Sequence, residues 1–327
     1  MMPREALFAI GAGLASATAA MAFLSGVFMA MGLVYLAPLP MLMVGLAYGP
    51  RAAATAALAG IMAMGVFGGP LMASIFAIVH ALPAWMIVKL ALMTRSGQPK
   101  ERSEENTSIN VAAVPDWLTP GQMISAMAFF AAGLMIASVV SVGDGGLSGF
   151  VAGHLEQVLG QMAPGLDGAD RERMAQAMTP LFPGAVATSW VIMAVVNTVT
   201  AQGILVRMSQ NRRPSPSYLG LELPSWISWP LVGAAVLALV GPGEWEYIGR
   251  NLTMVLALPY FFLGLAVFHT LARRVTATKP LLVAFYLVIV ISIWATVVVA
   301  GIGVVEQWFG LRHRIQPGPA NNDLNEE

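Results

Sequence analysis

The sequence contains no cysteine and unusually little charge. Without cysteine, the chain cannot form disulfide bonds, use thiolate catalysis or ligate an iron–sulfur cluster. Charged residues make up 10% of the 327 residues and the formal net charge is zero, whereas soluble chains are roughly 25% charged. No basic surplus is left to neutralise phosphates, so nucleic acid is not expected as a partner.

Catalytic signatures are also missing from the sequence. No glycine-rich loop ends in Gly-Lys-Ser or Gly-Lys-Thr, which excludes a P-loop grip on ATP. No His-Glu-x-x-His motif or cluster with zinc or iron spacing is present, and the four histidines are dispersed. We therefore expect no catalytic residues, no metal site, no cofactor and no enzymatic activity.

The sequence is instead rich in long apolar segments, and hydrophobic residues make up 57% of it. Such a chain would aggregate in water, but a lipid bilayer accepts it if every backbone polar group is bonded internally. The apolar runs are continuous and do not alternate as barrel strands do. The sequence therefore predicts an all-α integral membrane protein, a polytopic bundle of about eight to nine transmembrane helices.

A membrane span needs about 20 mostly apolar residues. The candidate spans are residues 5–24, 27–48, 51–67, 69–93, 121–143, 183–208, 227–241, 248–271 and 280–304. Gly49-Pro50 and Gly68-Gly69-Pro70 mark tight turns between the second, third and fourth spans. The first span is expected to remain in the protein and not to be a cleaved leader.

The spans and the polar stretches between them divide the chain into six parts. We expect four tightly connected helices, a flexible cytoplasmic linker, two helices with an outer amphipathic insert, a cytoplasmic connection, three C-terminal helices and a polar tail. These parts cover residues 1–93, 94–119, 120–208 (with the insert at 144–182), 209–226, 227–304 and 305–327.

Lysines and arginines concentrate in every second connection, which orients the chain in the membrane. Basic residues at Arg4, Arg51, 95–102, 207–213 and 273–279 mark the cytoplasmic side. The N-terminus is therefore expected to be cytoplasmic. One question stays open, because nine spans would place Arg312 and Arg314 outside and eight would place them inside.

The outer insert carries a helical pattern of apolar residues with spacings of three and four. This face comprises Leu147, Phe150, Val151, His154, Leu155, Val158, Leu159 and Met162, and a second short helix is expected at 169–178. The first helix could lie in the headgroup region, or it could act as a lid over an outward-facing site.

Four residues within the spans are candidates for ligand binding: His80, Asn197, Trp190 and Tyr35. A polar group at membrane depth is costly unless it has a partner or a role. We predict that His80 and Asn197 share one polar site in the outer half of the membrane, covered by the 147–162 helix. Hydrogen bonds between helices, or interfacial positions for the aromatic residues, are the competing interpretation.

Small residues line one face of the first span, at Gly11, Ala15, Ala19 and Ala22, beside a second row at Ala12, Ser16 and Ala20. Small side chains allow two helices to approach closely. The first row is therefore a helix-docking candidate, either for packing within this protein or for another membrane subunit.

The C-terminal stretch Gly301-Ile302-Gly303-Val304-Val305-Glu306-Gln307-Trp308-Phe309-Gly310-Leu311-Arg312-His313-Arg314 resembles the end of the YybS-like family of bacterial inner-membrane proteins. Asn197 with Gln202-Gly203, and Leu223-Pro224, are similar to that family as well. The first six helices of the family are similar to the substrate-binding S subunits of energy-coupling-factor vitamin transporters. Those subunits dock a transmembrane coupling subunit on a small-residue row of their first helix.

This resemblance implies a multi-pass protein of the bacterial inner membrane. The leading hypothesis is a membrane subunit that binds an unidentified small molecule and is energised by separate partners, one of which would dock on Gly11–Ala22. The alternative is a membrane scaffold or assembly factor of a cell-envelope complex. An enclosed cavity lined by some of the four candidates would favour binding, and packed or lipid-facing side chains would favour a scaffold.

Overall fold

The computed structural model describes residues 3–22, 28–94, 116–142 and 145–315. Within these ranges every regular element is a helix, apart from an isolated bridge between Thr94 and Trp117. The chain forms two compact units, each built from two stretches of sequence. Unit 1 comprises Met1–Thr119 and Trp190–Pro216, and unit 2 comprises Pro120–Ser189 and Ser217–Glu327. The prediction of an all-helical chain is confirmed.

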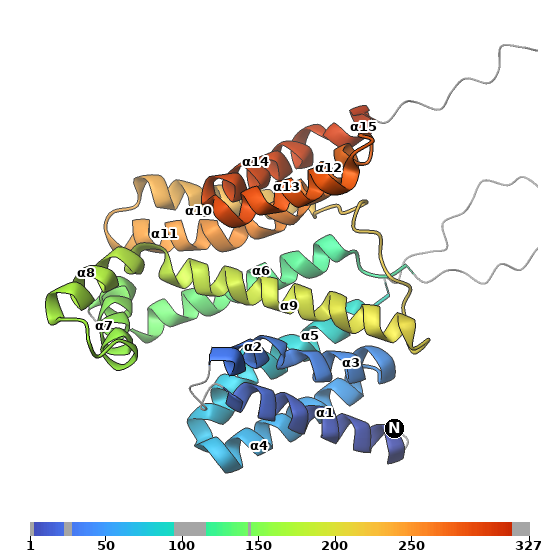
Figure 1. Cartoon of the computed structure of the whole chain (residues 1–327), viewed down its shortest axis with the longest axis horizontal. Helices are drawn as coiled ribbons and strands as arrows, with labels where there is room; N and C mark the ends of the chain where they lie inside the picture. Colours follow the sequence, from blue (N-terminus) through green and yellow to red (C-terminus); the bar gives the residue numbers. More distant parts are fainter. Residues whose placement is uncertain (1–2, 23–27, 95–115, 143–144, 316–327) are drawn as a thin grey trace, which may run out of the picture. The chain divides into compact units, whose positions relative to one another are not determined.

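Unit 1 is built around the N-terminal helices, drawn in blue in Figure 1. It contains α1 (Pro3–Met21), α2 (Phe28–Leu36), α3 (Pro38–Tyr48), α4 (Pro50–Phe76), a π-helical turn (Ala77–Ala81), α5 (Leu82–Ala91) and most of α9 (Phe182–Arg207). Most of the predicted linker, residues 95–115, lies outside the described residues.

The predicted turn at Gly68-Gly69-Pro70 is present inside α4. Gly69 has a φ of 81°, which glycine adopts readily and other residues do not. A Cβ atom on Gly60 would lie 2.7 Å from the Phe76 ring, so the chain after Gly69 returns alongside the chain before it. Helix α4 is therefore a hairpin of two helical arms.

Helix α1 packs closely on the first arm of α4 through glycine. A Cβ atom on Gly13 would lie 2.1 Å from the backbone oxygen of Ala56, and one on Gly60 would lie 3.0 Å from the backbone oxygen of Gly13. Ala9 and Ala17 are buried on the same side of α1. Small residues thus let the two backbones touch.

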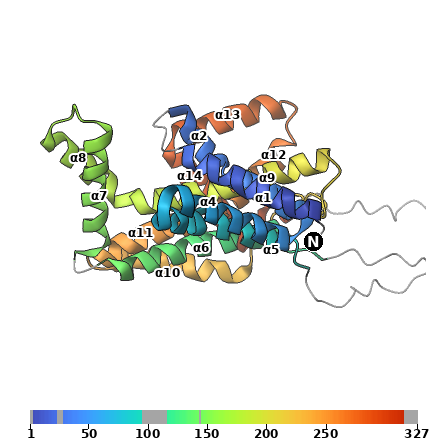
Figure 2. The same cartoon turned by 90° about the horizontal axis from the view of Figure 1, so that it is seen from below.

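Unit 2 contains the remaining helices (Figures 1 and 2). They are α6 (Pro120–Ser141), α7 (Gly146–Met162), α8 (Gly168–Met178), a 3₁₀ turn (Thr179–Leu181), the start of α9, α10 (Ser228–Val240), α11 (Glu244–Leu256), α12 (Leu258–Ala272), α13 (Thr278–Ile291), α14 (Ile293–Phe309) and α15 (Leu311–Ile315). In both views α7 and α8 lie at one end of this unit.

The ninth predicted span, 280–304, is not one straight helix. Helices α13 and α14 meet at a bend of 115°, where Ser292 has an extended backbone with φ −124° and ψ 114°. Residues 288–291 and Ile293 are all β-branched, which lowers helix propensity, and serine readily leaves a helix to begin the next one. This local composition explains the break that apolar length alone does not predict.

Four helical stretches among the described residues are long and apolar enough to cross a membrane, or five if the bent pair counts as one. The four are Pro50–Ala91, Pro120–Ser141, Gly168–Arg207 and Glu244–Ala272, and shorter apolar helices cover Gly32–Tyr48 and Ser225–Val240. The chain is thus a multi-pass helical protein with extensive apolar surface suited to lipid.

Candidate functional site

His80 lies in the π-helical turn that joins α4 to α5. Its side chain is buried, its ring centroid lies 5.5 Å from that of Phe76, and its Nδ1 atom has no hydrogen-bond partner. Turns of this kind widen a helix by one residue and occur frequently at functional sites. His80 is therefore held in apolar surroundings with one ring nitrogen unpaired.

Trp190 fastens α9 to this turn. Its indole Nε1 donates a hydrogen bond of 2.8 Å to the backbone oxygen of Val79, the residue before His80. In a regular helix the N–H of residue 83 would bond that oxygen, but Pro83 has no N–H to give. The Trp190 side chain thus satisfies a carbonyl that proline leaves free, which is a structural role.

Asn197 lies seven residues further along α9, on the same helical face, about 10 Å along the axis from Trp190. Its Nδ2 donates to the backbone oxygens of Tyr35 (2.6 Å) and Met193 (2.8 Å). Its buried Oδ1 has no partner. Because both donors are used on carbonyls, the amide orientation is fixed and the unpaired atom is an acceptor.

Tyr35 differs from the other three candidates. Its side chain is 53% exposed, and its backbone oxygen, not its ring, accepts the hydrogen bond from Asn197. The four predicted residues therefore lie in unit 1 on two helices and one turn, and Trp190 and Asn197 each join α9 to another element. Whether His80 and Asn197 share one pocket stays a prediction.

Ser16 on α1 was not predicted as a binding residue, although it belongs to the second row of small residues. It is fully buried and its Oγ has no partner. Ser16, His80 and Asn197, all in unit 1, make up three of the four such residues among the described part of the chain. The fourth is Thr188, which lies in unit 2 on α9, two residues before unit 1 resumes at Trp190.

The predicted docking row on α1 faces outward at its start. Gly11 and Ala15 are exposed, Ala19 and Ala22 are partly buried, and a Cβ atom on Gly11 would meet nothing within 4 Å. The close contact with α4 is made by Gly13 instead. The start of the row, at Gly11 and Ala15, is therefore exposed, and its role in docking stays a prediction.

Arg213 forms a polar cluster at the end of unit 1 that the sequence interpretation treated only as a topology signal. Its guanidinium donates to the backbone oxygens of Ala91 (3.1 Å) and Leu118 (2.8 Å) and lies over the Trp117 ring, 5.9 Å from the centroid. Gln202 on α9 donates to the Arg213 oxygen at 2.8 Å. A cation at the last carbonyls of α5 stabilises that helix end.

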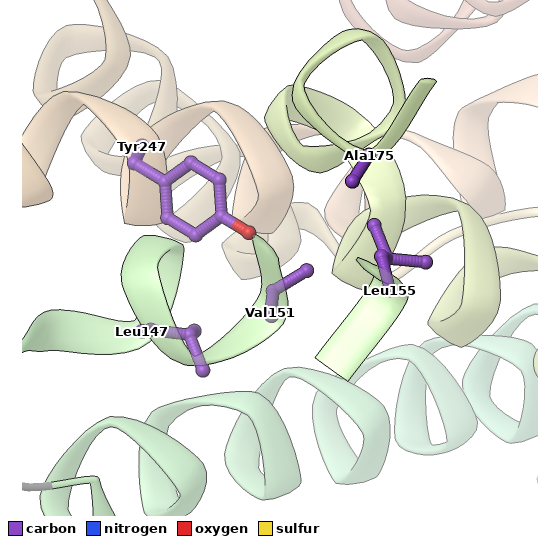
Figure 3. Packing of buried hydrophobic residues seen from close by; sticks show 5 residues of the cluster. All are labelled: Leu147, Val151, Leu155, Ala175 and Tyr247. Carbon is purple, nitrogen blue, oxygen red and sulfur yellow. The ribbon is translucent and has the colours of Figure 1, made fainter. Parts of the chain in front are cut away.

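The predicted insert at 144–182 forms two helices, α7 and α8, in unit 2. Leu147, Val151 and Leu155 pack against Ala175 of α8 and Tyr247 of α11 (Figure 3). Phe150 and Met162, from the same predicted apolar face, are instead 59% and 69% exposed. The buried face of α7 is therefore narrower than the sequence pattern suggests, and it packs against other helices of unit 2.

The lid over His80 and Asn197 stays a prediction, because α7 and those residues belong to different units. Glu244 of α11 fixes the start of α7, because its carboxylate accepts hydrogen bonds from the backbone N–H and the hydroxyl of Ser148. Among the residues described, no group of three or more His, Asp or Glu side chains is placed to hold a metal ion.

Comparison with known proteins gives one match. The model of the family described as "Predicted membrane protein (DUF2232)" matches residues 16–306. No match was found among the curated proteins or among the solved structures. Because the matched region covers most of the 327 residues, the chain belongs to this family of predicted membrane proteins.

Proposed function

We propose that this protein is an inner-membrane subunit that binds a small molecule within unit 1 and is energised by separate partners. The supporting observation is the group of unpaired buried atoms, Ser16 Oγ, His80 Nδ1 and Asn197 Oδ1. More than nine in ten buried polar groups find a protein or water partner. A small molecule with hydrogen-bonding groups would supply the missing partners.

The charges around these atoms suggest which kind of molecule would fit. In the described part of unit 1 the only buried charged side chain is Arg213, which already bonds two carbonyls. Placing a charged molecule among apolar helices without a counter-ion is costly. The ligand would therefore be uncharged.

The partner would dock on the exposed start of α1. Gly11 and Ala15 present no bulky side chain, so another helix could approach the backbone there. Docking of a coupling subunit would connect the binding unit to an external energy source. Lipid alone covering this face would argue against such a partner.

The topology we propose has eight or nine spans with a cytoplasmic N-terminus, in a bacterial inner membrane. The length of Pro50–Ala91 supports a count above five, because its 42 residues would extend about 63 Å as one helix, twice the roughly 30 Å thickness of the bilayer core. The turn at Gly69 divides it into two arms that each suit one crossing.

A membrane scaffold or assembly factor is the second candidate. It is favoured by the bonds of Trp190 and Asn197 to backbone oxygens, because these side chains hold their own unit together. In a scaffold the unpaired atoms would have water partners and no ligand would be recovered.

Purification from native membranes in mild detergent, followed by mass spectrometry of extracted small molecules and bound proteins, tests the proposal. We expect a stoichiometric uncharged compound and an ATPase-containing partner. The compound should be lost from the Ser16→Ala variant and retained in Thr18→Ala, whose exposed hydroxyl bonds its own helix at Leu14. Recovery of envelope proteins without any compound would favour the scaffold.

A second pair of variants separates binding from folding. His80→Ala combined with Asn197→Ala removes both unpaired atoms. Normal folding with loss of the compound would support the site. The single variants Asn197→Ala and His80→Ala should also be tested. If only Asn197→Ala fails to fold, the main role of the amide is its hydrogen bond to the backbone oxygen of Tyr35.

A further inference from the structure

The connection before α10 is buried although it has no regular structure. Residues 221–224 are neither helix nor strand, yet Leu221 and Leu223 are only 2% and 7% exposed. A buried irregular segment must find hydrogen-bond donors for its carbonyl groups outside itself. The end of α14 and the short helix α15 supply these donors.

Two side chains from the C-terminal stretch bond alternate carbonyls of this segment. The Arg312 guanidinium donates to the oxygens of Leu219 and Leu221, the latter at 2.7 Å, and Gln307 Nε2 donates to that of Leu223 at 3.3 Å. The Glu222 carbonyl points to the start of α6, where a Cβ atom on Gly121 would lie 1.9 Å from its oxygen. The segment is thus held between α6 and α14.

Glu306 fixes Arg312 in this position. Its carboxylate accepts from Arg312 Nε at 2.6 Å and from the Arg312 backbone N–H at 3.0 Å, and the two residues are only 4% and 8% exposed. Gly310, with φ 59°, turns the chain so that residue 312 returns to residue 306. Two buried charges persist only when their remaining groups are also bonded, as they are here.

We infer that Glu306, Gln307 and Arg312 form a lock that holds the C-terminal end on the same side of the membrane as residues 219–223. Arg212 and Arg213, a few residues earlier, mark that side as cytoplasmic. The chain between residues 223 and 312 therefore crosses the membrane an even number of times. This decides between the two predicted topologies in favour of a cytoplasmic tail.

The bent pair α13 and α14 agrees with this inference. A bend of 115° partly reverses the chain direction. The two helices have 14 and 17 residues, or about 21 and 25 Å, each shorter than the roughly 30 Å apolar core. The pair enters from the cytoplasmic side and returns to it, with Ser292 at the turning point.

Single cysteines in this cysteine-free chain test the inference. Ala320→Cys would report the tail, Ser215→Cys the connection before α10, and Gly168→Cys the outer insert. Each would be treated with a membrane-impermeant thiol reagent on intact and on lysed cells. We expect Ala320→Cys and Ser215→Cys to be labelled only after lysis. If Ala320→Cys is labelled under the same conditions as Gly168→Cys and not as Ser215→Cys, the inference is wrong. This holds whichever side of the membrane Ser215→Cys and Gly168→Cys occupy.

Hydrogen–deuterium exchange tests the lock separately. The amides of Leu221 and Ile227 are bonded to the oxygens of Tyr218 and Pro224. We expect their exchange to accelerate in Arg312→Ala and to accelerate less in Gln307→Ala, which removes one contact only. The control Arg314→Ala changes an exposed side chain and should leave exchange unchanged. Equal exchange in all three variants would show that no lock exists.

Discussion

Among the described residues, three of the four unpaired buried side-chain atoms lie in unit 1, and Thr188 Oγ1 is the one in unit 2. In unit 2 Asn251, Glu306 and Arg312 each have hydrogen-bond partners that use both ends of the side chain. In unit 1 His80 and Asn197 are equally buried, but one nitrogen and one oxygen have no partner. Burial of a polar group is costly in both cases, so the contrast suggests different roles for these side chains.

The pairing in unit 2 joins distant parts of the chain. Asn251 Oδ1 accepts a hydrogen bond of 2.7 Å from the backbone N–H of Gly184, and Asn251 Nδ2 donates one of 3.1 Å to the backbone oxygen of Pro180. These bonds connect α11 to the start of α9. Arg312 ties the last helix to the connection before α10. Complete pairing of this kind stabilises a fold, whereas an unpaired buried donor or acceptor has lost its hydrogen bonds to water without replacing them.

The largest effect is expected from Arg312→Ala. It leaves the buried Glu306 carboxylate without its cation and two carbonyls without their donor. Breaking one partner of a buried ion pair typically costs about 3–5 kcal/mol. Thermal unfolding in detergent should show this loss, and Arg314→Ala, at an exposed position, should unfold like the unchanged protein. If both variants melt at similar temperatures, the paired polar groups of unit 2 do not contribute to stability as the comparison requires.

Gly13→Ala should cost less, because it adds one methyl group at a tight contact. The new Cβ would lie 2.1 Å from the Ala56 oxygen, so α1 and α4 must separate. Overpacking of this kind costs about 1–3 kcal/mol. Gly11→Ala is the matched control, since its Cβ would meet nothing within 4 Å. If Gly11→Ala lowers the unfolding free energy of the purified chain more than Gly13→Ala does, the small-residue row that contains Gly11 packs within the protein.

Two asparagine variants compare the units directly. Asn251→Ala leaves the Gly184 N–H without an acceptor, which should cost about 1–3 kcal/mol. Asn197→Ala also removes a donor to Tyr35, but it eliminates an unpaired oxygen at the same time. We therefore expect a smaller loss of unfolding free energy at position 197. Equal losses in chemical or thermal unfolding would indicate that Asn197 Oδ1 is bonded in solution.

Much of the fold could be predicted from local sequence. Apolar length predicted the helices, and Gly69 before Pro70 predicted a turn that occurs with a positive φ. The break at Ser292 does not follow from apolar length, because the β-branched run before it is as apolar as a continuous span. The signal was present, but it depended on helix propensity, which is weak where tertiary contacts decide.

The polar contacts could not be predicted from the sequence. Pro83 shows that the Val79 carbonyl lacks its helical partner, but only the packing of α9 shows that Trp190 supplies one. The sequence alone shows Arg312 only as a basic residue that bears on the topology. Its pairing with Glu306, six residues earlier, depends on the turn at Gly310 and falls outside the spacings of three and four that connect residues along a helix.

The smallest expected effect, and the one that most sharpens the comparison, belongs to Ser16→Ala. The Ser16 hydroxyl is fully buried and has no hydrogen-bond partner, so its removal relieves a desolvation cost and replaces serine with a better helix former. We expect unfolding of the ligand-free protein to be unchanged or slightly harder, by less than about 1 kcal/mol. If unit 1 binds a ligand through this hydroxyl, the ligand-dependent rise in melting temperature should shrink in the same variant. A destabilised ligand-free variant would mean that the hydroxyl already has a partner, and the contrast between the two units would then not extend to α1.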